Sequence, residues 1–240
     1  MAKVGKKNDE QLINDKVYQT LRDSIIAGKL KPRERLNISR LADELGVSRT
    51  PIKITMDMLA LEGLVEVVPH SGAFVSDIYR DDLEEIYLMR SVLEGLAARL
   101  AVKHITLTDI EKLEKIVQAY DSGLVADNSQ KTLLLNADFH ISVALLCKRD
   151  RLINEIKKLY EYCLRYRVLS LNQMNKIEFS HIGHKEILEA LKSKDPDKVE
   201  RTVRQHLSKA PSFINETLKE FEKESTLSSI KDFWRNGTGD

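Results

Sequence analysis

The sequence has 240 residues, of which 42% are hydrophobic and 31% charged, and this composition indicates a folded protein rather than a disordered chain. Its formal net charge is +1, but residues 1–53 hold 12 Lys and Arg against 7 Asp and Glu, so the first segment is basic. No apolar run approaches the roughly 20 residues that a membrane helix needs, and the polar start of the sequence lacks the apolar core of a secretory signal. We therefore expect a cytoplasmic protein with no membrane contact, and the basic segment favours a polyanionic partner.

The first segment begins with an amphipathic helix. Apolar residues recur every four positions and predict a helix over 15–27, whereas the preceding residues 1–12 are expected to be disordered. A second, short helix follows, for which Asn37 or Ser39 is the candidate N-cap. Gly46 ends this helix and allows a sharp turn into the next one.

A third helix is predicted to begin at the stretch Ser48-Arg49-Thr50-Pro51. Ser48 is a natural N-cap, and Pro51 lies in the first turn, where its missing N–H costs nothing. Alternating apolar residues at 64–68 and 73–76 then predict a two-stranded hairpin. This order of helices, tight turn, helix and hairpin predicts a winged helix-turn-helix.

The amino end of the third helix gathers groups that suit nucleic acid. Its positive dipole end, backbone N–H groups and hydroxyls favour phosphate oxygens. Arg49 and Lys53 lie four residues apart and share a helix face, from which both can reach guanine O6 and N7 in a major groove. The alternative is that Ser48 only caps the helix and Arg49 is solvated, but the hairpin that follows favours DNA binding. The residues predicted to contact DNA are Arg40, Ser48, Arg49, Thr50, Lys53, His70 and Gly72.

After Val75 the sequence changes to long helical periods, so we place a domain boundary between residues 76 and 77. Large apolar residues spaced 3-4-3-4 predict a buried stripe on the first long helix: Ile86, Met89, Leu93, Leu96 and Leu100. Thr106 or Thr108 can cap a second helix. Further helices are predicted at 129–147, 150–171, 174–193, 196–224 and 227–234, with Asp195-Pro196 as cap and first residue of the helix over 196–224. The predicted fold is mainly α: a winged helix-turn-helix over 1–76, then an all-helical antiparallel bundle over 77–240.

Several segments together resemble one family of proteins. In the first part they are LRDSIIAGKLKPRERL (21–36), LADELGVSRTPIK (41–53) and LALEGLVEVVPHSGAFV (59–75), which resemble the GntR family of bacterial transcription regulators. In the second part YLMRSVLEGLAARLA (87–101), NADFH (136–140), HKEILEAL (184–191) and VRQHL (203–207) resemble its FadR-like subfamily. The resemblance implies a homodimer whose second domain, of the FCD type, mediates dimerisation and binds a small effector.

The sequence departs from the family pattern at three places in the first domain. Arg33 stands where the family usually has Gly after Pro, and Lys53 keeps the charge of the usual Arg without its bidentate fork. Ser71 stands where a wing residue is often basic, which leaves His70 and the backbone near Gly72 to meet phosphates or a minor groove.

The resemblance also implies a metal site. By their spacing alone, three scattered histidines are interpreted as core or surface residues, because the spacing is no local metal motif. In many relatives, however, the positions that match Asn136, His140, His184 and His206 are one Asp and three His that hold a divalent metal in a central cavity. Three imidazoles suit Zn, Ni or a similar ion. Because the amide of Asn136 is neutral, it binds a cation more weakly than Asp, and a metal-free pocket for an anion is the alternative.

Two clusters of charge in the helical domain are open to two interpretations. Arg90 and Glu94 are four residues apart, which alone suggests a surface ion pair. The resemblance instead puts Arg90 in or near the effector cavity, where its guanidinium would bind a carboxylate bidentately. The stretch Arg165-Tyr166-Arg167 is expected on a solvated helix face, with a cavity or dimer contact as the alternative.

Together these predictions describe a regulator, expected to be a repressor, that binds a palindromic operator in double-stranded DNA as a homodimer. A small effector, expected to be an organic acid that binds through its carboxylate, controls the affinity for the operator. Two other functions stay open. A helical di-iron metalloenzyme needs two Glu-x-x-His pairs, of which the chain has one, at Glu178 and His181, so we expect no enzyme. A DNA-binding protein without an effector is the other.

Overall fold

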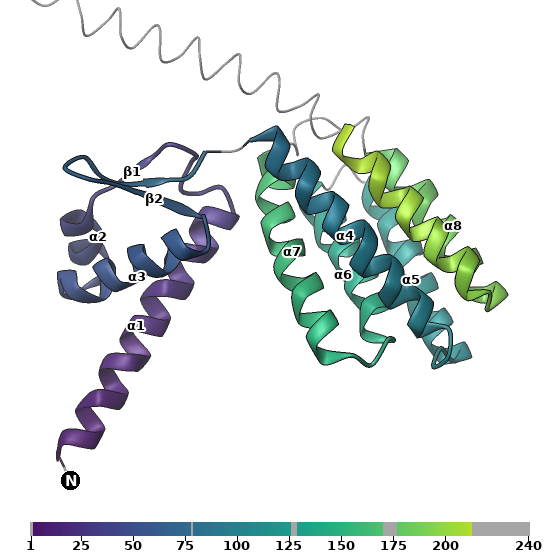
Figure 1. Ribbon diagram of the computed structural model, residues 1–240, viewed down its shortest axis with the longest axis horizontal. Coiled ribbons are helices and arrows are strands. Elements are labelled where there is room, and N and C mark those ends of the chain that lie inside the picture. Colours follow the sequence, from purple (N-terminus) through teal and green to yellow (C-terminus); the bar gives the residue numbers. More distant parts are fainter. Residues whose placement is uncertain (1, 78, 126–128, 170–176, 213–240) are drawn as a thin grey trace, which may run out of the picture. The chain divides into compact units, whose positions relative to one another are not determined.

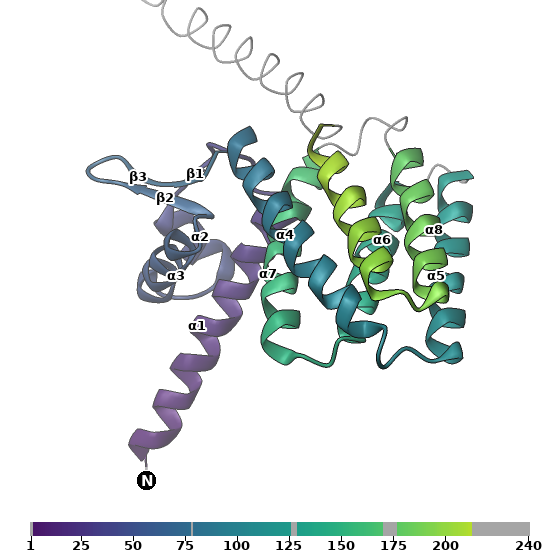
Figure 2. The ribbon, with the colours of Figure 1, turned by 45° about the vertical axis from the view of Figure 1, so that its right-hand side comes forward.

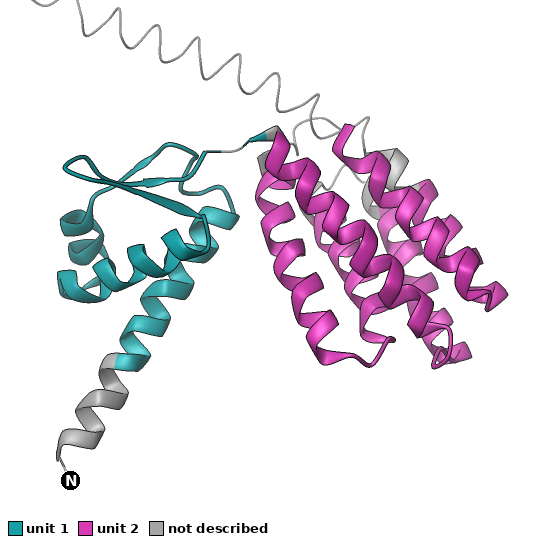
Figure 3. Cartoon of the chain, viewed as in Figure 1, with its two compact units in different colours: residues 1–79 teal, residues 80–240 magenta. Residues whose placement is uncertain are grey.

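A computed structural model describes residues 2–77, 79–125, 129–169 and 177–212. The chain divides into two compact units, residues 1–79 and 80–240 (Figure 3). The division falls three residues after the boundary expected from the sequence. Among the described residues, no helix is both long and apolar enough to cross a membrane.

The first unit is a winged helix-turn-helix (Figure 1). Its elements are α1 (Ala2–Ile26), β1 (Arg35–Leu36), α2 (Ile38–Leu45), α3 (Arg49–Leu61), β2 (Val65–Val68) and β3 (Gly72–Val75). The strands form an antiparallel sheet in the order β1-β3-β2, in which Leu36 pairs with Ala73 and Val67 with the same residue from the other side. The predicted fold class is confirmed. The strand β1 was not predicted, because it has only two residues and no pattern of its own.

Helix α1 is longer than predicted. It begins at Ala2, so the described backbone is helical where the sequence analysis expects disorder over 1–12. The stretch contains no proline and several good helix formers, which favour a helix. The buried part uses Val17, Leu21 and Ile25, which pack against α3.

Local capping sets the geometry between α2 and α3. The Asn37 side chain accepts hydrogen bonds from the backbone N–H groups of Ser39 and Arg40, so Asn37 is the N-cap of α2. Gly46 ends α2 at φ 65°, in the left-handed region that favours glycine. Arg33 also has φ 65°, although it replaces the glycine of the family pattern. Its Nε donates to an Asp77 oxygen at 2.6 Å, which anchors the strained residue.

The second unit is a bundle of helices that run side by side (Figure 2). Its elements are α4 (Arg80–Ala101), α5 (Leu107–Val125), α6 (Ser129–Leu145), α7 (Asp150–Leu169), α8 (Ile177–Ser193) and a helix over 196–212. Thr106 and Asp109 form a reciprocal capping box at the start of α5, and Asp195 caps the last helix through the N–H groups of Asp197 and Lys198. The predicted continuation to 224 and the predicted helix at 227–234 lie outside the described residues.

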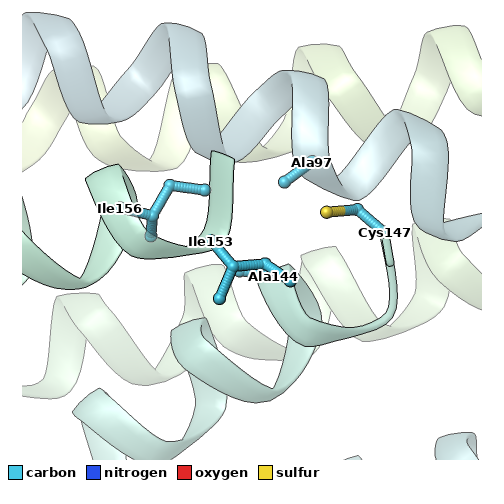
Figure 4. Packing of buried hydrophobic residues seen from close by; sticks show 5 residues of the cluster. All are labelled: Ala97, Ala144, Cys147, Ile153 and Ile156. Atoms are coloured by element: carbon cyan, nitrogen blue, oxygen red, sulfur yellow. The ribbon is translucent and has the colours of Figure 1, made fainter. Parts of the chain in front are cut away.

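The bundle core includes a cluster of small and branched residues where α4, α6 and α7 meet: Ala97, Ala144, Cys147, Ile153 and Ile156 (Figure 4). Leu93 and Leu100 pack against this cluster but stay partly exposed. The alanine on α4 lets the neighbouring helices approach closely, so the core there is made by close backbone contact rather than by large side chains.

The predicted buried stripe of α4 is wrong. Met89 and Leu96 are 45% and 39% exposed, and the other predicted members are only half-buried. The buried face of α4 instead holds an aromatic residue, an ion pair and small residues: Leu83, Tyr87, Arg90, Glu94, Ala97, Ala98 and Ala101. The prediction followed the 3-4-3-4 spacing of the largest apolar residues, but the face of α4 that points toward the core carries Arg90 and Glu94.

Candidate functional site

The start of α3 is exposed, and its N-cap side chain is not used for capping. Ser48 is the N-cap residue by its extended backbone, but its side chain makes no capping hydrogen bond. Ser48, Arg49 and Thr50 are all exposed, and Lys53 lies one turn later on the exposed side of the helix. The backbone N–H groups of the first turn have no partner inside a helix, so this end can accept phosphate oxygens. That these residues contact DNA stays a prediction.

The other predicted DNA contacts lie on α2 and the hairpin. Arg40 is exposed, and its Nε donates to Glu44 at 2.7 Å. His70 lies in the turn between β2 and β3, and Gly72 is the first residue of β3; both are exposed, with φ of 64° and 112°. The guanidinium of Arg35 lies against Gly72, with Nε 3.6 Å from where a Cβ would be. Arg35 therefore brings a cation to the wing, which the sequence analysis missed because the pairing of β1 with β3 has no local signal.

Three histidines from three different helices meet in the core of the second unit. His140 on α6, His184 on α8 and His206 on the helix over 196–212 are buried, and their ligand atoms all lie within 4.8 Å of one another. Nε2 of His140 lies 3.3 Å from Nε2 of His184. The rings of His140 and His206 stack with centroids 5.3 Å apart.

This donor set fits a divalent metal ion. Burial lowers the pKa of His140 and lowers that of His206 further, with the neighbouring His140 adding to the effect, so both imidazoles are neutral. The neutral imidazole is the form that binds a metal. Nδ1 of His206 is buried without a hydrogen-bond partner among the described residues. Three imidazoles at this separation suit Zn or Ni.

Asn136 lies one turn before His140 on α6 and is fully buried. Its Nδ2 donates to the hydroxyl of Tyr160 on α7 at 3.0 Å. The amide of Asn136 therefore donates to the Tyr160 hydroxyl, whereas an ionised Asp at this position could only accept from it. Its predicted role as a fourth ligand stays a prediction.

A buried ion pair lies beside the histidines. Arg90 is 0% exposed, and its Nε donates to Glu94 Oε1 at 2.6 Å, so the interpretation as a surface ion pair is wrong. The other carboxylate oxygen, Oε2, accepts from Nδ1 of His140 at 2.8 Å. Burial alone would raise the pKa of Glu94, but Arg90 and His140 bring it down to about 2, so the carboxylate is ionised.

The guanidinium of Arg90 keeps both of its NH₂ groups without an oxygen or nitrogen partner among the described residues. Nη1 and Nη2 are both buried. Arg90 Cζ lies 5.0 Å from the ring centroid of Tyr87 and 4.8 Å from that of Tyr160, so aromatic rings flank the cation. The nearby thiol of Cys163, whose pKa burial raises, is a weak acceptor. This environment can bind an anion through the two Nη groups.

The helix face around Arg165 is not solvated. Arg165 and Tyr166 are 6% and 5% exposed, so the expectation of a solvated face was wrong, whereas the alternative of a cavity or dimer contact stays a prediction. Arg167 donates from Nε to the hydroxyl of Tyr87 at 2.9 Å. Tyr87 lies one turn before Arg90 on α4. A second cation thus stands near the first.

The open space in this core is small. A cavity of about 10 Å³ is lined by Glu94, His140 and apolar residues of α6, α8 and the last helix. This volume accommodates about one water or one ion. A ligand larger than this does not fit the cavity unless its lining side chains move.

Comparison with known proteins agrees with both units. Residues 13–75 match the family described as bacterial regulatory proteins, gntR family, and residues 85–209 match the FCD domain. The chain is 27% identical to the HTH-type transcriptional regulator YdhC of Bacillus subtilis (strain 168), over 85% of this chain and 91% of that protein. It is 25% identical to the HTH-type transcriptional repressor RspR of Escherichia coli (strain K12), over 91% of this chain and 94% of RspR.

Among solved structures, E. coli McbR/YncC has a similar fold. Its TM-score is 0.71 at 21% identity, and the match covers 86% of this chain and 98% of McbR/YncC. Both domains are thus present in the order that the residue patterns indicated, a DNA-binding head followed by an FCD domain. The chain belongs to the GntR family of bacterial transcription regulators that carry an FCD domain.

Proposed function

We propose that this regulator binds its operator through α3 and the wing, and that a small carboxylate bound at Arg90 controls the affinity for DNA. The observation that carries the proposal is the pair of buried Nη groups on Arg90, for which the described part of the chain offers no partner stronger than the thiol of Cys163. A buried cation without partners for its donors is costly, and a bound carboxylate would satisfy both donors at once. Arg90 lies in the core of the FCD domain, which is the domain we propose to bind the effector.

A divalent metal is the second part of the proposal. His140, His184 and His206 would hold Zn²⁺ or Ni²⁺, with Asn136 as a neutral fourth donor. Such a metal supplies a Lewis-acidic position for an anionic ligand. The sites of metal and carboxylate would share one core, because Glu94 contacts both Arg90 and His140.

A homodimer is the third part. The outer face of α4 carries exposed apolar side chains: Leu88, Met89, Val92 and Leu96. A second copy of the chain would cover this face and place two copies of α3 on the half-sites of a palindrome. We expect Val92→Glu to shift the sedimentation coefficient from dimer to monomer, and an unchanged sedimentation coefficient contradicts this interface.

We propose repression as the mode of regulation, supported by the name of RspR as a repressor. The proposed location is the cytoplasm, where the operator lies. Turnover of a substrate is not part of the proposal, since the relatives above are named as regulators.

DNA binding is tested with duplexes selected from a random pool, measured by fluorescence anisotropy. Arg49→Ala should weaken binding by about 1–3 kcal/mol, because Arg49 would contact a base edge or phosphate. Lys103→Ala, which removes one exposed charge from the helical unit, is the matched control. Equal affinity of the two variants contradicts the role of α3.

Effector binding is tested by adding succinate or citrate, with and without Zn²⁺, to the protein–DNA complex. We expect one of them to change the DNA affinity of the unmodified protein, and Arg90→Lys to reduce this response, because Lys lacks the bidentate fork. Arg204→Lys, a change at an exposed arginine, is the control. If no carboxylate changes DNA affinity or melting temperature, the regulator has no carboxylate effector.

A further inference from the structure

We propose that Glu94 is a positioning residue that selects the tautomer of His140 and so prepares its Nε2 for a metal. The inference rests on the proposed function, because it assigns a role within the same site. It concerns the contact between Glu94 and His140, which joins α4 to α6 and which the spacing of Arg90 and Glu94 along one helix does not indicate.

The carboxylate of Glu94 is used on both oxygens. Oε1 accepts from Arg90 Nε at 2.6 Å, and Oε2 accepts from His140 Nδ1 at 2.8 Å. The side chains of the three residues are between 0% and 4% exposed, so water does not compete for these bonds. One acidic group in the core therefore fixes two donors that come from α4 and α6.

The hydrogen bond to Glu94 decides where His140 carries its proton. An ionised carboxylate can only accept, so Nδ1 of His140 must be the donor. A neutral imidazole with its proton on Nδ1 has a lone pair on Nε2. Nε2 is the atom that faces His184 at 3.3 Å, on the side where the three histidines meet. Glu94 thus directs a lone pair into the cluster.

An amide at position 94 would reverse this arrangement. Gln has one acceptor oxygen and one NH₂ group, and Arg90 can only donate. The oxygen therefore turns to Arg90, and the NH₂ group faces Nδ1 of His140. That nitrogen must then accept, which moves the imidazole proton to Nε2 and blocks it as a ligand. Loss of such a partner commonly lowers metal affinity 10–100-fold.

The experiment uses the full chain and Zn²⁺ alone. Long-range ¹H–¹⁵N NMR of the metal-free protein reports the tautomer of His140, and competition with a chromophoric chelator gives the Zn²⁺ affinity. We expect an Nδ1–H tautomer in the unmodified protein. Glu94→Gln should show the Nε2–H tautomer and a Zn²⁺ affinity about 10–100-fold lower. A merely structural role of Glu94 would change stability without inverting the tautomer.

Two further variants make the result decisive. Glu94→Asp keeps two acceptor oxygens and should keep the Nδ1–H tautomer. Glu189→Gln makes the same chemical change on the exposed face of α8, where Glu189 pairs with Lys192, and should leave both readouts unchanged.

Each outcome has one meaning. An Nε2–H tautomer of His140 in the unmodified protein overturns the inference at once, even if Glu94→Gln fails to fold. Equal Zn²⁺ affinity of the unmodified protein and Glu94→Gln overturns the role of Glu94 and leaves the proposed function intact. If the unmodified protein binds no Zn²⁺, the metal part of the proposed function is wrong, whereas the tautomer still tests the positioning by Glu94.

Discussion

The two helices of the helix-turn-helix begin at polar residues that do different work, and a pair of alanine substitutions separates them. Asn37 accepts from two backbone N–H groups, at 3.0 and 3.1 Å, whereas the hydroxyl of Ser48 makes no capping bond. Asn37→Ala therefore removes two hydrogen bonds of the folded protein. Ser48→Ala removes none and takes away only a group that is exposed at the start of α3.

The number of hydrogen bonds lost sets the expected size of each effect. Loss of a side-chain N-cap costs about 1 kcal/mol, which corresponds to about 4–8 °C in the melting temperature of a domain of roughly 60–100 residues. We expect this loss for Asn37→Ala and at most a few tenths of a kcal/mol for Ser48→Ala. If the Ser48 hydroxyl donates to a phosphate, its loss costs about 1.5 kcal/mol or more, which is about tenfold in DNA affinity.

The measurements are thermal unfolding followed by circular dichroism and anisotropy titration with a selected duplex. Asn37→Ala should melt earlier and, at a temperature where it is folded, bind DNA nearly as the unmodified protein does. Ser48→Ala should melt as the unmodified protein does and bind DNA more weakly. Equal destabilisation by both substitutions, or unchanged DNA affinity of Ser48→Ala, refutes the reasoning.

Three predictions concern the helical unit. Gly183→Ala should abolish Zn²⁺ binding measured by chelator competition, because its Cβ would lie 1.9 Å from Nδ1 of His206, whereas Gly95→Ala meets only a flexible arginine side chain and should retain binding. Arg90→Met should lower the free energy of unfolding in urea by about 3–5 kcal/mol, because it leaves the buried Glu94 carboxylate without its cation and with His140 as its remaining partner, and a smaller loss than for Glu94→Gln would contradict this. Since the pKa of Glu94 falls from 4.5 to about 2 on folding, its stabilisation is complete above pH 4.5 and is lost as the pH falls toward 2. Acid titration of melting temperature should show this loss, and Glu94→Gln should lack it.

Most of the fold was predictable from local signals in the sequence. Caps and breakers act within a few residues, so the starts of α2, α3 and α5 could be placed from Asn37, Ser48 and Thr106. β1 could not be predicted, because two residues become a strand only through their pairing with β3. The start of α1 at Ala2 was not predicted, because no capping residue or apolar period before residue 15 marks it.

The candidate site was less accessible to sequence reasoning. His140, His184 and His206 lie on separate helices, and only the family resemblance brought them together before the structure did. The contact between Glu94 and His140 joins α4 to α6, and its existence depends on how the helices pack. No spacing along one helix encodes it.

The inverted pattern of α4 links these observations. A helix selected only for stability places apolar residues toward the core, and a buried ion pair contributes no more than an apolar pair of similar volume would. On α4 the core face carries Arg90 and Glu94, while Leu88 and Met89 are exposed on the outer face. Charge in the core is explained if ligands complete its hydrogen bonds, and apolar side chains outside are explained if a second copy covers them. Both faces of α4 then take part in regulation, and a change at the ligand can reach the dimer contact through a single rigid element.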